Sequence, residues 1–151
     1  MKVLVFTHTF APNVGGVETY LRLLAEGLVA LGAEEGGEQV EVTVATRTPR
    51  GEHDDAALVY RVVREPSALE LLRLVDDADV VHLGGATLGP LLMGLARRKP
   101  VVVEHHAYQS ICPNGLLLHE PDKTACRGQF MARRYDDCVR CMASQEGGAI
   151  G

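Results

Sequence analysis

The sequence has no tryptophan, no internal repeat and no apolar run that approaches the roughly 18 residues of a membrane span. The missing apolar run excludes a transmembrane helix. A basic excess is also missing, since 15 basic and 20 acidic residues give a net charge of −5, which argues against a nucleic-acid-binding protein. With 46% hydrophobic and 23% charged residues, the 151-residue chain is typical of globular proteins, which excludes disordered, collagen-like and mucin-like classes.

Apolar periodicity predicts alternating strands and helices. Residues 2–7 form a β-branched and aromatic run; we expect a strand buried on both faces of a parallel sheet, and no signal peptide, because polar residues follow without a cleavage site. From Val17 to Leu31 apolar residues recur at helical spacing, and Gly32 is placed to end that helix in a left-handed conformation. The other predicted strands are 40–45, 58–63, 79–83 and 100–104, and the other predicted helices are 66–75, with Pro66 in its first turn, and 87–97.

This alternation predicts a doubly wound α/β domain with a parallel sheet and right-handed crossovers. Helical and strand periodicity fades after about residue 107. We therefore expect a Rossmann-like core at 1–107, a loop-rich, cysteine-containing segment of the same domain at 108–142, and a linker or frayed end at 143–151. Residues 33–38 are polar and glycine-containing, which predicts a surface loop.

Two adjacent glycines, Gly15 and Gly16, lie between the first predicted strand and the first predicted helix. In an open α/β sheet, ligands bind beyond the carboxyl ends of the strands, and the N–H groups at a helix start favour an anion such as phosphate. The pattern is neither a Rossmann Gly-x-Gly-x-x-Gly nor a Walker A loop, because the third glycine and the Gly-Lys-Ser/Thr are absent. A phosphate site and a turn that needs positive φ both remain open at this point.

Histidines also follow predicted strands. His105 and His106 come directly after the fifth strand, at the same carboxyl edge, where an imidazole can act as a general base, a hydrogen-bond donor or a metal ligand. Loop histidines with local hydrogen bonds are the alternative. His8 and His82 lie at strand ends as well, and we interpret both as buried histidines with satisfied hydrogen bonds.

All four cysteines fall in the second half of the chain, at Cys112, Cys126, Cys138 and Cys141. Four thiolates that end in Cys-x-x-Cys can build a tetrahedral zinc site, and a metal would stabilise a segment that has no strong core pattern. Unligated structural thiols are one alternative. Disulfides or redox chemistry are the other, although disulfides require an oxidising compartment that nothing else in the sequence indicates.

Four stretches carry a resemblance to a known family. They are Phe6-Thr-His-Thr-Phe-Ala-Pro-Asn-Val-Gly-Gly-Val-Glu-Thr-Tyr, Asp79-Val-Val-His-Leu, Val101-Val-Val-Glu-His-His-Ala-Tyr, and Cys112-Pro-Asn-Gly-Leu-Leu with the later cysteines. In this order, from residue 2 to about 142, the chain resembles the N-terminal domain of family 4 glycosyltransferases, which are retaining enzymes of the GT-B fold with two Rossmann-like domains across a cleft. Two positions depart from the family pattern: Gly84 stands where a second His is frequent, and Ala107 replaces the Asp of a His-Asp-Tyr segment.

The resemblance implies the acceptor-side half of an enzyme that uses a nucleotide-diphosphate sugar donor and an unknown acceptor. It implies that Gly15 and Gly16 bind the donor diphosphate through backbone N–H groups, and that His106 hydrogen-bonds the donor sugar or the leaving phosphate. The cysteine cluster would be structural, shaping the acceptor side. No catalytic metal is expected, because a carboxylate cluster that would hold one is absent.

The family's main donor contacts, including a Glu-x7-Glu motif, come from its C-terminal domain. Glu18 and Glu26 have that interval here, but they lie in the first predicted helix. We therefore expect the chain to be inactive without a C-terminal GT-B domain, whether it is a fragment, a truncated gene product or half of a split pair.

Two other classes remain open. One is a stand-alone, zinc-stabilised Rossmann-like binding or scaffold domain without turnover; the other is a zinc-containing redox or regulatory protein with a reactive Cys138 or Cys141. The expected location is the cytoplasm, with peripheral association at the inner face of the membrane open for a family that has lipid acceptors.

Overall fold

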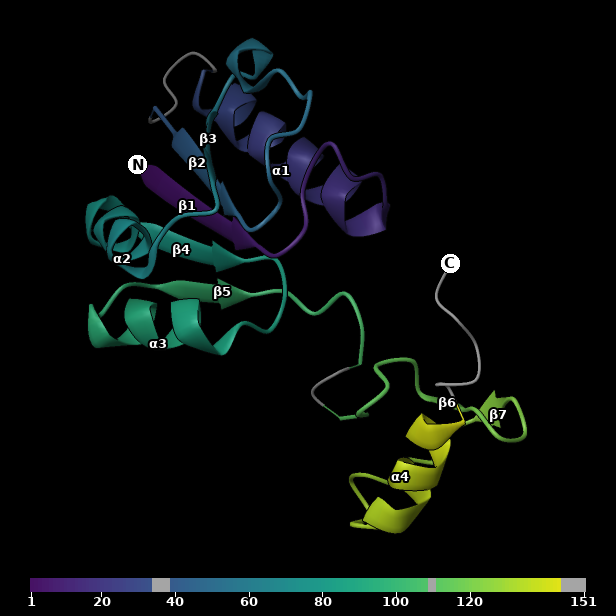
Figure 1. Cartoon of the computed structure of the whole chain (residues 1–151). Helices are drawn as coiled ribbons and strands as arrows, with labels where there is room; N and C mark the ends of the chain where they lie inside the picture. The colour runs from purple at the N-terminus through teal and green to yellow at the C-terminus, as the bar shows by residue number, and fades with distance from the viewer. Residues whose placement is uncertain (34–38, 109–110, 145–151) are drawn as a thin grey trace. The chain divides into compact units, whose positions relative to one another are not determined.

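The computed structural model describes residues 1–33, 39–108 and 111–144. The chain forms two compact units (Figure 1): residues 1–104, which we call the sheet unit, and residues 105–151, which we call the cysteine unit. Most of the predicted surface loop at 33–38 and of the predicted linker at 143–151 lies outside the described residues.

The sheet unit is built on a five-stranded parallel sheet with the order β3-β2-β1-β4-β5. Its strands are β1 (Lys2–Thr7), β2 (Glu41–Thr46), β3 (Arg61–Arg64), β4 (Val80–Leu83) and β5 (Val101–Val103). In the central strand β1, Val5 lies opposite Val44 of β2 and His82 of β4. The chain adds strands on one side of β1 and then on the other, so the order reverses between β1 and β4. The predicted doubly wound α/β fold is confirmed.

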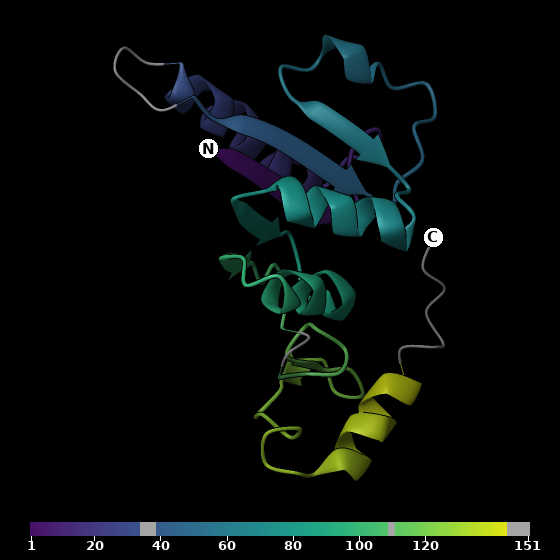
Figure 2. The ribbon, with the colours of Figure 1, turned by 90° about the vertical axis from the view of Figure 1, so that its left-hand side faces the viewer.

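Three helices cover the two faces of this sheet (Figure 1, Figure 2): α1 (Gly16–Gly32) on one face, and α2 (Ala68–Asp77) with α3 (Leu88–Ala96) on the other. Successive side chains of a strand point to opposite faces. Val5 therefore packs with Leu21 of α1, whereas its neighbour Phe6 packs with Leu71 of α2, and all four are buried. This two-sided burial explains why β1 reads as an uninterrupted apolar run.

The end of α1 corrects one prediction. Gly32 is the last residue of the helix and does not adopt a left-handed conformation. A Cβ at this position would lie 2.5 Å from the backbone nitrogen of Val40. The residue is therefore glycine because the chain entering β2 passes too close for a side chain.

The region around β3 and α2 corrects two more predictions. The strand begins at Arg61 and not at residue 58, because Leu58 and Tyr60 pack on the core under α1 without joining the sheet, after a 3-10 turn at Asp55–Ala57. Pro66 lies before the helix and not in its first turn. The N-cap of α2 is Ser67, which forms a reciprocal capping box with Glu70.

The cysteine unit contains an antiparallel pair of two-residue strands, β6 (Leu118–His119) and β7 (Thr124–Ala125), and one helix, α4 (Tyr135–Ala143). Turns make up most of the remainder, as predicted for a loop-rich segment, but α4 was not predicted. Its nine residues hold three charged side chains and two cysteines, which conceals the apolar periodicity of a helix. None of the described helices combines the length and the apolar character that a membrane crossing requires.

Candidate functional site

The glycine pair lies where the sheet order reverses. Gly15 is the N-cap of α1, with extended backbone at φ −168° and ψ 177° and no side-chain cap, and Gly16 is the first helical residue. Neither residue has a positive φ. The backbone conformation therefore does not require glycine at either position, which removes the positive-φ turn as an explanation.

The two glycines differ in what surrounds them. A Cβ on Gly15 would lie 2.4 Å from Oε2 of Glu18, so that carboxylate turns back over the helix start. A Cβ on Gly16 would have no heavy atom within 4 Å. Neither packing nor backbone conformation thus requires a glycine at position 16. The missing side chain leaves the start of the helix open to a ligand.

A second pair of glycines follows β4, and the fold accounts for both. A Cβ on Gly84 would lie 2.6 Å from Cδ1 of Leu21, a fully buried residue of α1. Gly84 also donates its N–H to the Phe6 carbonyl at 2.8 Å. Gly85 has φ +137°, a conformation that L side chains rarely adopt. These glycines allow close approach and a turn, and they supply no separate argument for a ligand.

A hydrogen-bonded group that the sequence did not indicate lies at the end of β5. Oε2 of Glu104 is 3.0 Å from Nε2 of His82, with the two side chains 24% and 14% exposed. Tyr20 of α1 hydrogen-bonds the same carboxylate, and that bond, followed by burial, raises the pKa of Tyr20. The prediction of a satisfied, largely buried histidine thus holds for His82. For His8 it is wrong, because that residue is exposed, with its ring edge-on to Phe6.

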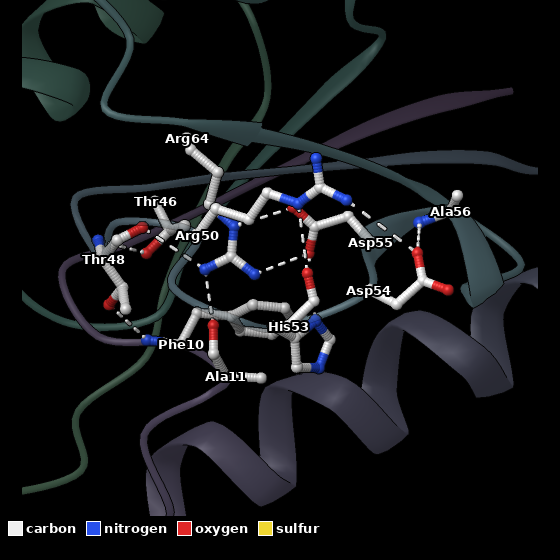
Figure 3. A network of polar contacts seen from close by, with 10 residues as sticks. All are labelled: Phe10, Ala11, Thr46, Thr48, Arg50, His53, Asp54, Asp55, Ala56 and Arg64. Atoms are coloured by element: carbon white, nitrogen blue, oxygen red, sulfur yellow. Dashed lines mark hydrogen bonds and ion pairs between the residues drawn. The ribbon is translucent and has the colours of Figure 1, made fainter.

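The loop between β1 and α1 is anchored by Arg64, the last residue of β3 (Figure 3). Its guanidinium donates to both oxygens of Asp55, at 2.7 and 3.0 Å, and to the carbonyl oxygens of Ala11 and Thr48. The Arg64 and Asp55 side chains are only 11% and 17% exposed. The guanidinium, more than the His53 ring 3.1 Å away, holds the pKa of Asp55 below its usual value.

Further contacts in Figure 3 tie the same loop to β2. The Phe10 N–H donates to the hydroxyl of Thr48 at 2.9 Å, and the Thr48 N–H donates to the hydroxyl of Thr46 at 3.1 Å. The Arg64 guanidinium lies 5.8 Å from the centre of the buried Phe10 ring. The loop that carries Gly15 is thus held by buried polar groups. It borders an open hollow of about 350 Å³ lined by Ala11, Pro12, Asn13, Val14, Glu18, Thr19, Arg22 and His53.

The predicted histidine pair opens the cysteine unit. His105 and His106 have exposed side chains, and β5 ends two residues earlier at Val103. Gly15 and Gly16 belong to the sheet unit. That His106 and the glycines act in one site therefore stays a prediction.

The structure brings the four cysteines together. All of them line one small cavity, Cys112 and Cys141 are buried, and none is in a disulfide. Burial, followed by the nearby thiols, raises the pKa of Cys138. Among the residues that the structure describes, however, no three His, Cys, Asp or Glu side chains are already arranged to hold a metal ion.

The fold and the loop at the strand reversal define a Rossmann-like α/β domain. Comparisons with protein families, with curated proteins and with solved structures find no match to this chain. Any more specific function is therefore inferred from the residues themselves.

Proposed function

We propose that the chain is the acceptor-side domain of a retaining GT-B glycosyltransferase, and that it completes an active site together with a C-terminal donor-binding domain. The observation that carries the proposal is Gly16. It begins α1 at the point where the strand order reverses, and neither packing nor backbone conformation requires it to be glycine. The resemblance of the surrounding Gly-Gly-Val-Glu segment to family 4 supports the same reading.

In this proposal the first N–H groups of α1 bind the diphosphate of a nucleotide-sugar. These groups have no partner within the helix, and the helix dipole favours an anion beside them. Hydrogen bonds to the diphosphate stabilise the negative charge that develops on the leaving group. The Glu18 carboxylate must turn aside first, because it lies over Gly15 and would repel the ligand.

We expect the isolated chain to bind nucleotide-sugars weakly, with dissociation constants on the order of 1 mM, which corresponds to about 4 kcal/mol. One wall of a cleft cannot fix donor and acceptor together, so no sugar transfer is expected. Titration of the ¹⁵N-labelled chain with UDP-, GDP- and ADP-sugars, and with pyrophosphate, should shift the amide signals of Gly15, Gly16 and Val17 first. Sub-micromolar binding would overturn the two-domain reading, and unshifted amides would favour a scaffold domain without turnover.

A matched pair of glycine variants separates ligand binding from folding. Gly16→Ala and Gly27→Ala both place a methyl group where nothing lies within 4 Å, in the same helix. Each should keep or raise the free energy of unfolding, by up to about 1 kcal/mol. Gly16→Ala should weaken pyrophosphate binding at least tenfold because its methyl group occupies the ligand's approach, whereas Gly27→Ala should leave binding unchanged. Equal affinities for the two variants would refute a site at the start of α1.

The resemblance assigns His106 to the cleft, and this role is tested in a complete enzyme that contains the domain. Because His106 is exposed, its side chain supports little packing. His106→Ala should remove a hydrogen bond to a charged group and lower turnover by roughly ten- to a hundredfold, with unfolding unchanged. His105→Ala is the matched control. Loss of turnover in His105→Ala alone would contradict the assignment.

A further inference from the structure

The cysteine unit has almost no apolar interior. Within residues 105–108 and 111–144, the only buried residues are Cys112, Gly115, Glu120 and Cys141. Leu117 and Leu118 are half-buried, and the other larger apolar side chains are exposed, namely Tyr108, Ile111, Leu116, Phe130, Met131, Tyr135, Val139 and Met142. Segments of about 40 residues rarely fold on apolar burial alone and usually need a disulfide or a metal. Since all four cysteines are free thiols, the unit lacks disulfides as well.

The four cysteines come from three separate parts of this unit and line one cavity. Cys112 lies in a turn closed by its N–H bond to the Tyr108 carbonyl, at 2.8 Å, and Cys126 directly follows β7. Cys138 and Cys141 are three residues apart on α4 and so share one face of the helix. The cavity that all four line has a volume of about 10 Å³. Four thiols that line one cavity are the ligand set of a single tetrahedral metal ion.

Hydrogen-bond donors already point at one of the sulfurs. Sγ of Cys141 accepts the backbone N–H of Glu120 at 3.3 Å and the side-chain amide of Asn114 at 3.4 Å. The Asn114 oxygen accepts the S–H of Cys112 at 2.9 Å, so this one amide contacts two of the cysteines. N–H donors favour the thiolate form of sulfur, and such outer contacts orient the ligands of metal sites.

We propose that Cys112, Cys126, Cys138 and Cys141 bind one Zn²⁺ in a tetrahedral, all-thiolate site that takes the place of a hydrophobic core in the cysteine unit. Binding forms four Zn–S bonds of about 2.3 Å and releases four thiol protons to solvent. As thiols the side chains stand apart, with Cys112 hydrogen-bonded to Asn114 and Cys141 to the Leu118 carbonyl, so the sulfurs must contract around the ion. Asn114 acts as a positioning residue. The proposal does not depend on glycosyltransferase activity.

Metal analysis of the full chain tests the proposal directly. Protein purified under reducing conditions without chelator should contain close to one zinc per chain. Replacement of zinc by Co²⁺ should give the intense sulfur-to-cobalt charge-transfer bands and the visible spectrum of four tetrahedral thiolates. Iron in place of zinc, or less than about a fifth of an equivalent of any metal after zinc is supplied, would overturn the proposal.

Variants separate the ligands from their neighbours. His119 lines the same cavity, and its Nδ1 is 2.7 Å from Oδ1 of Asp122, an arrangement also seen in metal-bound histidines. His119→Ala should nevertheless leave the cobalt spectrum unchanged, whereas Cys126→Ser should remove one thiolate from it. Asn114→Ala should weaken zinc affinity roughly ten- to a hundredfold, with the wild-type spectrum at saturating metal.

The opposite response of these two variants would indicate a different set of metal ligands. If His119→Ala loses the metal while Cys126→Ser keeps the full spectrum, the all-thiolate set is wrong. Thiol titration gives a second readout that does not depend on variants. The four thiols should react slowly in the zinc-loaded chain and all at once after chelation, and equal rates before and after chelation would contradict the proposal.

Discussion

An Arg64→Ala variant is expected to lose about 3 kcal/mol of the free energy of unfolding of the sheet unit. The substitution leaves the Asp55 carboxylate, only 17% exposed, without its two guanidinium bonds, and His53 remains as a weaker partner. It also removes the donor to the carbonyl oxygens of Ala11 and Thr48. The loss in the free energy of unfolding is measured by chemical denaturation of the full chain, monitored by circular dichroism.

Arg50→Ala is the matched control. Arg50 lies in the same network, but its side chain is 62% exposed and its ion pair with Asp54 is 4.0 Å long. Exposed pairs contribute 1 kcal/mol or less, so we expect a change within about 0.5 kcal/mol. Equal destabilisation by the two variants would show that the buried pair has no special role.

The pH dependence supplies a second check. The folded-state pKa of Asp55 is lowered from its ordinary 3.8. A depressed carboxyl pKa contributes stability above the unfolded pKa, and this contribution disappears as the pH falls through the folded pKa. The stability gap between wild type and Arg64→Ala should therefore be full at pH 7 and should narrow below about pH 4. A gap that widens in acid would contradict the assignment.

Much of the sheet unit follows from the sequence because strands buried on both faces carry a strong signal. The runs at 2–7 and 40–45 predict β1 and β2 to within one residue. The errors arise where side chains serve contacts that are distant in the sequence. Tyr60 looks like part of a strand but packs beside Phe10, with ring centres 6.5 Å apart. Gly32 is a glycine because the backbone of Val40 passes too close for a side chain. No local pattern contains that information.

The residues of the candidate sites also fall into two groups, those that the sequence indicates and those that only the folded structure shows. Gly15, Gly16 and the four cysteines are recognisable because few residue types suit their chemistry. Arg64 and Glu104 were missed because each looks locally like an ordinary charged residue at the end of a strand, and their partners come from other elements. Asn114 gave no signal either, because only the folded unit shows its amide between two cysteine sulfurs. Burial and pairing, which decide the role of a charged side chain, are tertiary properties.

Removal of zinc is expected to unfold the cysteine unit while the sheet unit stays folded. Structural zinc sites in small domains contribute about 10–16 kcal/mol, more than the few buried residues of this unit can replace. The two apolar clusters of the sheet, around Val5 and around Phe6, lie within residues 1–104 and include no cysteine. Their packing is therefore independent of the metal.

Limited trypsin digestion with and without a chelator resolves the two units, since each contains its own cleavage sites. Chelation should expose the sites after Lys123, Arg127, Arg133, Arg134 and Arg140 within minutes, while cleavage after Arg64 and Arg73 stays slow. The Cys126→Ser variant keeps three ligands and should hold the metal more weakly, so without chelator it should be digested faster than the wild type, and chelator should bring both chains to the same rate. If digestion of the cysteine unit is unchanged by chelator, the metal is not its core. If the sheet unit becomes sensitive at the same time, the two units are not independent in stability, because the loss of the metal would then destabilise apolar clusters that contain none of its four ligands.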